Sequence, residues 1–274
     1  MNSENLAYLH NTLKYLGFGG KAKLLRELEE MIRKNQKDFQ LTSEYDFSDI
    51  CRMEVTLSFR RAEQTERYYF NRFHARLTYS DPDITSRSQL FYIDRGHGIT
   101  CKEAFNLLQG RAVYKGLFTK EGARYYAWLQ LNFAERDKND NYKVLRYYEN
   151  YGFDLEAVLE RFRIREMNIP QLRDALLKSL RRGNIHPVTL SKEEPHNRML
   201  VEASPQFKTI NLYPDADPGK LPGEIANPEV VEIPSDEDEQ NLPFWNDEDE
   251  EPDQANGLFK EQGAARRRTR KKIA

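Results

Sequence analysis

The sequence has little cysteine, and this excludes a fold that depends on disulfides. Its 274 residues include two cysteines, Cys51 and Cys101, whereas small extracellular domains held by disulfides carry several pairs. A chain of this length can bury enough apolar surface to fold without a disulfide or a structural metal. We therefore expect two inert, buried thiols and a reducing compartment.

Long apolar stretches are missing as well. Residues Met1–Asn5 lack the basic and apolar segments of a secretory signal. No later stretch approaches the roughly eighteen apolar residues of a membrane span. We expect a cytoplasmic protein with no membrane partner.

Catalytic and cofactor signatures are absent too. The five histidines are scattered, and none belongs to a nucleophile or metal-ligand motif. His97 and Cys101 are close in sequence, but two ligands do not complete a zinc site. The segment Gly17–Gly20 has the glycines of a phosphate loop without the preceding strand or the Lys-Ser/Thr pair. We expect no catalytic residue, no metal and no cofactor. The alternative is an enzyme whose site assembles only in the folded chain.

Charge is distributed in three blocks. Residues 1–213 hold 34 lysines and arginines against 28 aspartates and glutamates, a net of +6. Residues 214–263 hold 2 basic and 16 acidic residues, and residues 264–274 hold 6 basic and no acidic ones. From residue 214 onward the chain is also rich in proline and too poor in apolar residues to offset its chain entropy. We predict a folded body over 1–213, a disordered acidic tail over 214–263 and a basic tip over 264–274.

Within the body, the hydrophobic period alternates between that of a helix and that of a strand. Helices are predicted over 6–16, 24–32, 100–109, 154–162 and 170–182, the first two as a helical hairpin. Strands are predicted over 39–47, 53–59, 69–79, 90–93, 112–118, 123–133, 142–148, 188–190, 199–202 and 209–213. Thr100 and Glu103 match a capping box at the start of the third helix. Residues 138–141, between two of the strands, tolerate a positive φ. The order of helices and strands predicts an α+β fold with helices packed on one face of a mainly antiparallel sheet. One interpretation is that the body consists of two structural units within the one chain, about 1–95 and 96–213.

One predicted sheet face combines aromatic and basic side chains. Its residues alternate with the expected core positions of two strands or come from a neighbouring strand, and they are Tyr68, Phe70, Arg72, His74, Arg76, Tyr126, Trp128, Arg146 and Tyr148. Such a face can stack the bases of a single-stranded nucleic acid and hold its phosphates. The structural alternative is that these aromatics form cross-strand pairs or lie beneath a second layer.

The tail contains two more candidate sites. Six cations at the tip can hold phosphates or neutralise the acidic segment, and they are Arg266, Arg267, Arg268, Arg270, Lys271 and Lys272. The motif Leu242-Pro243-Phe244-Trp245 is apolar between two acidic runs, and we interpret it as a docking motif for a protein partner. The alternative is an incidental aromatic cluster.

Six segments of the body resemble one group of known sequences. They are Asn5–Gly19, Glu103–Val113, Tyr126–Phe133, Glu149–Leu155, Ser179–Asn184 and Ala203–Tyr213. They are similar to uncharacterised proteins carried on conjugative transposons and plasmids of gut-commensal bacteria, often encoded near DNA-processing and transfer genes. The resemblance covers about residues 1–213 and implies a bacterial, cytoplasmic, mobile-element context. That family has no established activity, so the resemblance assigns no role to any residue.

These features favour a non-enzymatic accessory protein of a mobile genetic element. We expect it to bind nucleic acid, single strands in preference to duplex, or a protein of the element's DNA-processing or transfer machinery. Besides an enzyme, the remaining alternative is a protein–protein adaptor that uses residues 242–245. The sequence does not indicate an oligomeric state.

Overall fold

A computed structural model describes residues 3–48, 50–94, 96–119, 122–190 and 198–214 of the chain. These residues form five α-helices and three antiparallel sheets, which confirms the predicted α+β class. The acidic tail and the basic tip lie outside the described residues. So do their candidate sites, Leu242–Trp245 and Arg266–Lys272.

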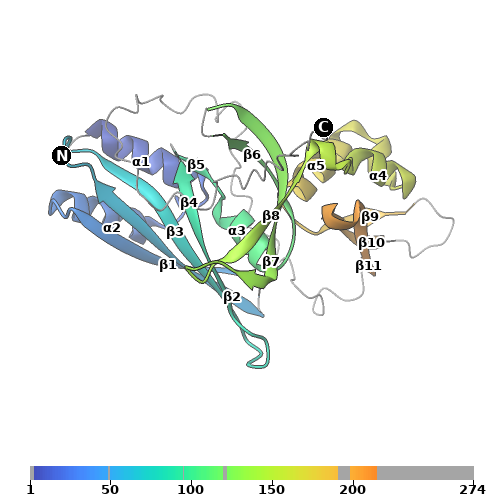
Figure 1. Ribbon diagram of the computed structural model, residues 1–274, viewed down its shortest axis with the longest axis horizontal. Helices are drawn as coiled ribbons and strands as arrows, with labels where there is room; N and C mark the ends of the chain where they lie inside the picture. Colours follow the sequence, from blue (N-terminus) through green and yellow to red (C-terminus); the bar gives the residue numbers. More distant parts are fainter. Residues whose placement is uncertain (1–2, 49, 95, 120–121, 191–197, 215–274) are drawn as a thin grey trace, which may run out of the picture.

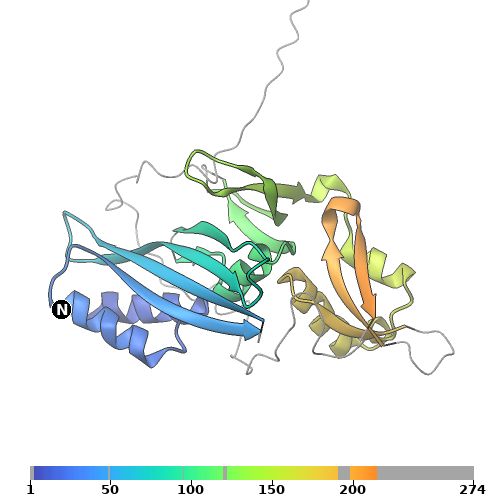
Figure 2. The ribbon, with the colours of Figure 1, turned by 90° about the horizontal axis from the view of Figure 1, so that it is seen from below.

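The first sheet is a meander of five strands in sequence order. The strands are β1 (Asp38–Ser48), β2 (Cys51–Arg61), β3 (Tyr68–Tyr79), β4 (Arg87–Asp94) and β5 (His97–Gly98). Three helices pack on one face of this sheet, and they are α1 (Ser3–Tyr15), α2 (Ala22–Arg33) and α3 (Cys101–Leu108). Figures 1 and 2 show α1 and α2 side by side along that face. The predicted helical hairpin is therefore present.

The core of this region follows from the alternation in the sequence. Met53, Val55 and Leu57 of β2 are fully buried against the helices, while the residues between them point to the outer face. The first turn of α3 contains the capping box that its sequence predicts, with Thr100 and Glu103 each accepting from the other's backbone N–H. Local sequence thus specifies both the strands and the helix that lies beneath them.

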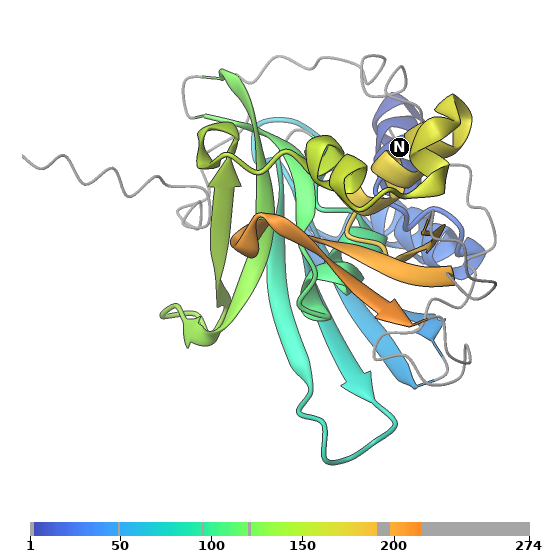
Figure 3. The same ribbon diagram turned by 90° about the vertical axis from the view of Figure 1, so that its right-hand side faces the viewer.

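The rest of the described chain contains two three-stranded sheets and two helices (Figures 1 and 3). One sheet contains β6 (Val113–Phe118), β7 (Arg124–Arg136) and β8 (Tyr142–Tyr148), and the other contains β9 (His186–Thr189), β10 (Arg198–Ser204) and β11 (Thr209–Pro214). The helices are α4 (Leu155–Arg161) and α5 (Pro170–Arg181), and three short 3-10 turns are η1 (Glu149–Tyr151), η2 (Arg165–Asn168) and η3 (Pro205–Phe207). The two helices pack with the second three-stranded sheet around a separate apolar cluster.

Strand β7 separates the two apolar clusters. Ala127, Leu129 and Leu131 point into the cluster beneath the five-stranded sheet. Trp128, on the opposite face of the same strand, belongs to the cluster of α4 and α5. The boundary between the clusters therefore runs through the β6–β7–β8 sheet.

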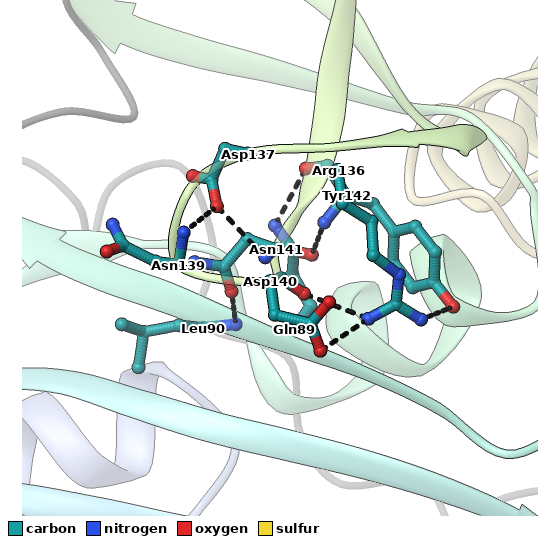
Figure 4. Close-up of polar contacts among 8 residues, drawn as sticks. All are labelled: Gln89, Leu90, Arg136, Asp137, Asn139, Asp140, Asn141 and Tyr142. Carbon is teal, nitrogen blue, oxygen red and sulfur yellow. Dashed lines mark hydrogen bonds and ion pairs between the residues drawn. The ribbon is translucent and has the colours of Figure 1, made fainter.

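The turn between β7 and β8 connects the β6–β7–β8 sheet to strand β4 of the five-stranded sheet (Figure 4). The buried side-chain amide of Gln89 in β4 accepts from the backbone N–H of Tyr142 at 2.8 Å and donates to its carbonyl at 3.3 Å. The backbone N–H of Leu90 donates to Asn141 Oδ1 at 2.9 Å. Asp140 adopts a φ of 62° in this turn, as the sequence predicted for the 138–141 segment. These contacts satisfy the backbone along the edge of β4 and hold the β6–β7–β8 sheet in a fixed position.

Two general properties of the described ranges bear on function. None of their helices combines the length and the apolar character that crossing a membrane requires. Nowhere in these ranges do three His, Cys, Asp or Glu side chains come together in a way that could hold a metal ion.

Candidate nucleic-acid interface

A β-bulge at Asn71 changes which residues of β3 face outward. Phe70 pairs with Phe59 and Arg72 pairs with Ser58, so Asn71 has no partner on β2. The extra residue shifts the alternation by one position, and Tyr68 and Phe70 consequently point inward. Their exposed fractions are 3% and 5%. The prediction that these two rings lie on the outer face is wrong.

Three of the nominated residues do lie on the outer face of the first sheet. His74 and Arg76 are exposed and Arg72 is half-buried. Glu54 lies directly opposite Arg76 on β2, so this face mixes both signs of charge. Burial, followed by the positive charge of Arg76, lowers the pKa of His74. With Tyr68 and Phe70 withdrawn into the core, the nominated residues of β3 offer charges here but no tyrosine or phenylalanine ring.

The indole of Trp128 is also not available to a ligand. Its exposed fraction is 5%, and it packs beneath Leu155 and Leu176 in the second cluster. Its ring centroid lies 5.4 Å from that of Phe153 in an edge-to-face arrangement. The prediction that Trp128 is a surface residue is wrong, because α4 and α5 form the second layer that the structural alternative anticipated.

The register of β8 separates Arg146 and Tyr148 from the other nominated aromatics. Arg146 pairs with Leu129 and Tyr148 pairs with Ala127. Directly opposed residues of antiparallel strands point to the same side of a sheet, so both residues lie on the face of the first cluster. Trp128 pairs instead with Tyr147. The prediction that Arg146 and Tyr148 share a face with Tyr126 is therefore wrong.

Tyr126 belongs to a different aromatic surface, which we call the tyrosine face. It consists of Tyr114, Tyr126, Tyr147 and Tyr151 with three cations, Arg124, Arg181 and Lys208. The four rings are half-buried or exposed, and the three cations are exposed. The face crosses β6, β7 and β8 and continues to η1 and the residue that follows η3.

At one end of the tyrosine face, two rings are stacked. The rings of Tyr114 and Tyr126 lie 5.6 Å apart with an angle of 14° between their planes. Arg124 lies over Tyr126 at 5.1 Å, and Arg181 lies over Tyr114 at 5.9 Å. Gly116 makes this arrangement possible, because a Cβ there would lie 3.0 Å from the Tyr126 ring. Cations over aromatic faces are the arrangement that single-strand binding surfaces use.

At the other end, Tyr147 and Tyr151 form a second aromatic pair with 4.9 Å between ring centroids. The Tyr151 hydroxyl donates to the Gln206 carbonyl at 2.9 Å, and Lys208 Nζ lies 4.6 Å from the Tyr151 ring centroid. Figure 2 shows η1 beside the tip of the β10–β11 hairpin that carries η3. This contact joins segments that are far apart in sequence into one surface.

Tyr114 and Tyr147 of this face remain neutral at physiological pH. Burial, and then the negative charge of Glu149, raises the pKa of Tyr114. Burial, and then the neighbouring Tyr151, raises the pKa of Tyr147. A neutral phenol does not repel phosphate, so the charge of the rings and cations together is positive, with Glu149 beside them as an opposing charge.

Of the tyrosine face, sequence reasoning found Tyr126 and missed Tyr114, Tyr147, Tyr151, Arg124, Arg181 and Lys208. The pairing of Trp128 with Tyr147 depends on a register shift between Asn132 and Arg136 in β7, which alternation along one strand does not reveal. The closeness of Tyr151 and Lys208 depends on tertiary packing. One available signal was Gly116, since a glycine in the interior of a strand often marks a close approach of another group.

Comparisons with known proteins do not add a functional assignment. No family model, no curated protein and no solved structure matches the chain. The resemblance to mobile-element proteins therefore remains an expectation, and the functional argument depends on the described surface.

Proposed function

We propose that this protein binds single-stranded nucleic acid through the tyrosine face, as a non-enzymatic accessory protein of a mobile genetic element. The observation that carries the proposal is the presence of two pairs of accessible tyrosine rings, each with a cation over one of its rings. Stacking of a base on an aromatic side chain contributes about 1–3 kcal/mol and tolerates any base. Two aromatic pairs flanked by cations fit that mode of binding.

The distribution of charge supports the same surface. Residues 1–108 hold 16 basic and 15 acidic residues, whereas residues 109–213 hold 18 basic and 13 acidic ones. Nearly all of the positive excess of the body thus belongs to the part of the chain that builds the tyrosine face. A positive field beside stacking rings favours a polyanion and makes its binding depend on salt.

Single strands fit better than duplex. The bases of a duplex are stacked on each other, and removing one from the stack costs a few kcal/mol. The tyrosine face has flat rings at the surface of a sheet, and the bases of a single strand can reach such rings without that cost. The resemblance to proteins encoded near DNA-processing and transfer genes supports a mobile-element context for this activity.

Two tyrosines provide a matched test. Tyr126 and Tyr148 lie on β7 and β8 with similar exposed fractions, 37% and 40%, but on opposite faces of the sheet. In the full-length chain, we expect Tyr126→Ala to weaken binding of a labelled single-stranded oligonucleotide by about 1–3 kcal/mol. We expect Tyr148→Ala to leave the affinity unchanged. Fluorescence anisotropy over a salt series measures both.

Two outcomes would overturn this proposal. One is equal loss of affinity in the two variants, which would place binding elsewhere on the molecule. The other is an affinity for duplex that equals or exceeds the affinity for single strands of the same length. The same comparison for a charged residue uses Arg181→Gln on the tyrosine face and Arg76→Gln on the first sheet, because both arginines are exposed.

A further inference from the structure

The segment between α4 and α5 exposes three large apolar side chains. They are Phe162, Ile169 and Leu172, with exposed fractions of 37%, 43% and 46%. Phe162 follows the last residue of α4, Ile169 is the N-cap of α5, and Leu172 lies in the first turn of α5. We call this region the α4–α5 corner.

The backbone around the corner is fixed, so these side chains are held outward. Arg163 has a φ of 52°, which is uncommon for a residue other than glycine. The adjacent Ile164 is buried and forms a β-bridge with Leu190. An ordered turn that buries Ile164 and exposes Phe162 presents an apolar surface that its own neighbours do not cover.

Three arginines surround this apolar surface. Arg161, Arg163 and Arg165 are exposed, and in the described part of the chain none of them forms an ion pair or a hydrogen bond to a carboxylate. Arg173, in the first turns of α5, is the one that pairs, with Glu156. The corner is therefore apolar, and its border holds three arginines without carboxylate partners against the exposed acids Glu160 and Asp174, so a partner that suits it is apolar with an acidic border.

The tail of the same chain contains a segment with that chemistry. The motif Leu242–Trp245 has four consecutive acidic residues before it, at 236–239, and five after it, at 247–251. Leu242 follows Pro214, the last residue of β11, by 28 positions. Strand β11 packs against α4, so the tail leaves the described part of the chain close to the corner.

We propose that residues Leu242–Trp245 dock on the α4–α5 corner of their own chain, with the acidic flanks facing Arg161, Arg163 and Arg165. A flexible chain of 28 residues has an r.m.s. end-to-end distance of about 30 Å, which suffices for the motif to reach a surface beside its point of attachment. Attachment gives the motif an effective concentration of about millimolar there, so weak apolar contacts are sufficient. This interaction is independent of nucleic-acid binding.

Tryptophan fluorescence of the full-length chain tests the docking. The chain has two tryptophans, Trp128 and Trp245, and Trp128 is buried. Subtracting the spectrum of Trp245→Phe from that of the unaltered chain isolates Trp245. We expect this spectrum to be shifted to the blue, and less quenched by acrylamide, than that of a synthetic peptide of residues 235–251. We also expect the shift to decrease as salt is raised.

Paired variants locate the site. Leu172→Ser and Arg163→Glu should each return the Trp245 spectrum to that of the peptide. Ile84→Ser, whose side chain is 44% exposed and lies outside the corner, and Arg76→Glu should leave it shifted.

Three results would overturn the proposal. A Trp245 spectrum in the unaltered chain that equals the peptide spectrum would exclude docking. A shifted spectrum that the corner variants do not change would place the motif elsewhere. A shift that appears only as concentration and molecular mass rise together would identify a second copy as the occupant. Because no nucleic acid is present, failure here leaves the tyrosine face untested and intact.

Discussion

The strands behind the outer face of the five-stranded sheet and those behind the tyrosine face both mix aromatic and basic residues. The side chains that they expose are different. In β3 the run from Tyr68 to Arg76 mixes aromatic and basic residues, yet Tyr68, Phe70 and Phe73 lie in the core and the charges lie outside. In the β6–β7–β8 sheet, rings from three strands reach the surface around a buried Trp128. Composition predicted aromatic–basic surfaces in both places, and only the pairing of strands decided where one exists.

The cause of the difference is local in each region. A single unpaired residue, Asn71, moves Tyr68 and Phe70 from one face of β3 to the other. In the second region the register shift in β7 brings Tyr147 beside Trp128. A change of one position in register exchanges all side chains between the two faces of a strand. A prediction of which side chains share a face therefore fails after a register error of one residue. A prediction that a strand exists does not depend on the register.

The largest expected effect concerns Trp128, which is buried beside Tyr114 of the tyrosine face. Trp128→Ala removes a side chain that is buried under α4 and α5, and we expect it to lower the free energy of unfolding by about 3–5 kcal/mol. Tyr126→Ala, two residues away on the same face of β7 but with a side chain that is 37% exposed, should cost less than about 1 kcal/mol. Urea denaturation followed by circular dichroism measures both. Equal, small losses would mean that Trp128 lies on an open surface, as the sequence alone suggested.

A smaller effect is expected from a variant that disturbs the tyrosine face without removing any of its side chains. A Cβ at Gly116 would lie 3.0 Å from Tyr126 Cε1 and 3.1 Å from Arg124 Nε, so Gly116→Ala displaces both groups. We expect weaker binding of single strands, by about 1 kcal/mol, because the stacked arrangement is disturbed. The comparison is Gly20→Ala, where a Cβ meets nothing within 4 Å and the affinity should not change. Unchanged binding in Gly116→Ala would mean that the Tyr114–Tyr126 stack is not used.

Much of the fold could be predicted, because it depends on local signals. Alternation identified the strands, the Thr100–Glu103 capping box identified the start of α3, and the 138–141 turn was read from residues that tolerate a positive φ. The face of the candidate site could not be predicted in the same way. The bulge at Asn71 becomes visible only when two residues of β3 are seen opposite one of β2. Lys208 reaches Tyr151 only through tertiary packing.

The smallest expected effect compares a histidine from each region. Burial lowers the pKa of His186 in β9, and Glu166 partly opposes this. Burial also lowers the pKa of His74 in β3, followed by Arg76, with Glu54 opposing. In both cases the folded protein disfavours the protonated ring, whereas the unfolded chain takes up that proton near the ordinary value of 6.5. The unfolding free energy therefore falls as pH decreases below that value.

Replacing each histidine by glutamine separates the two contributions. His186 is half-buried and His74 is exposed, so solvent screens the charge of His74 more strongly. We expect His186→Gln to reduce the loss of stability between about pH 7.5 and about pH 5.5 more than His74→Gln does. Urea midpoints of the two variants and the unaltered chain, measured at both pH values, decide this. A larger effect at His74 would mean that the outer face of the first sheet is covered in solution, contrary to the exposed polar surface described above.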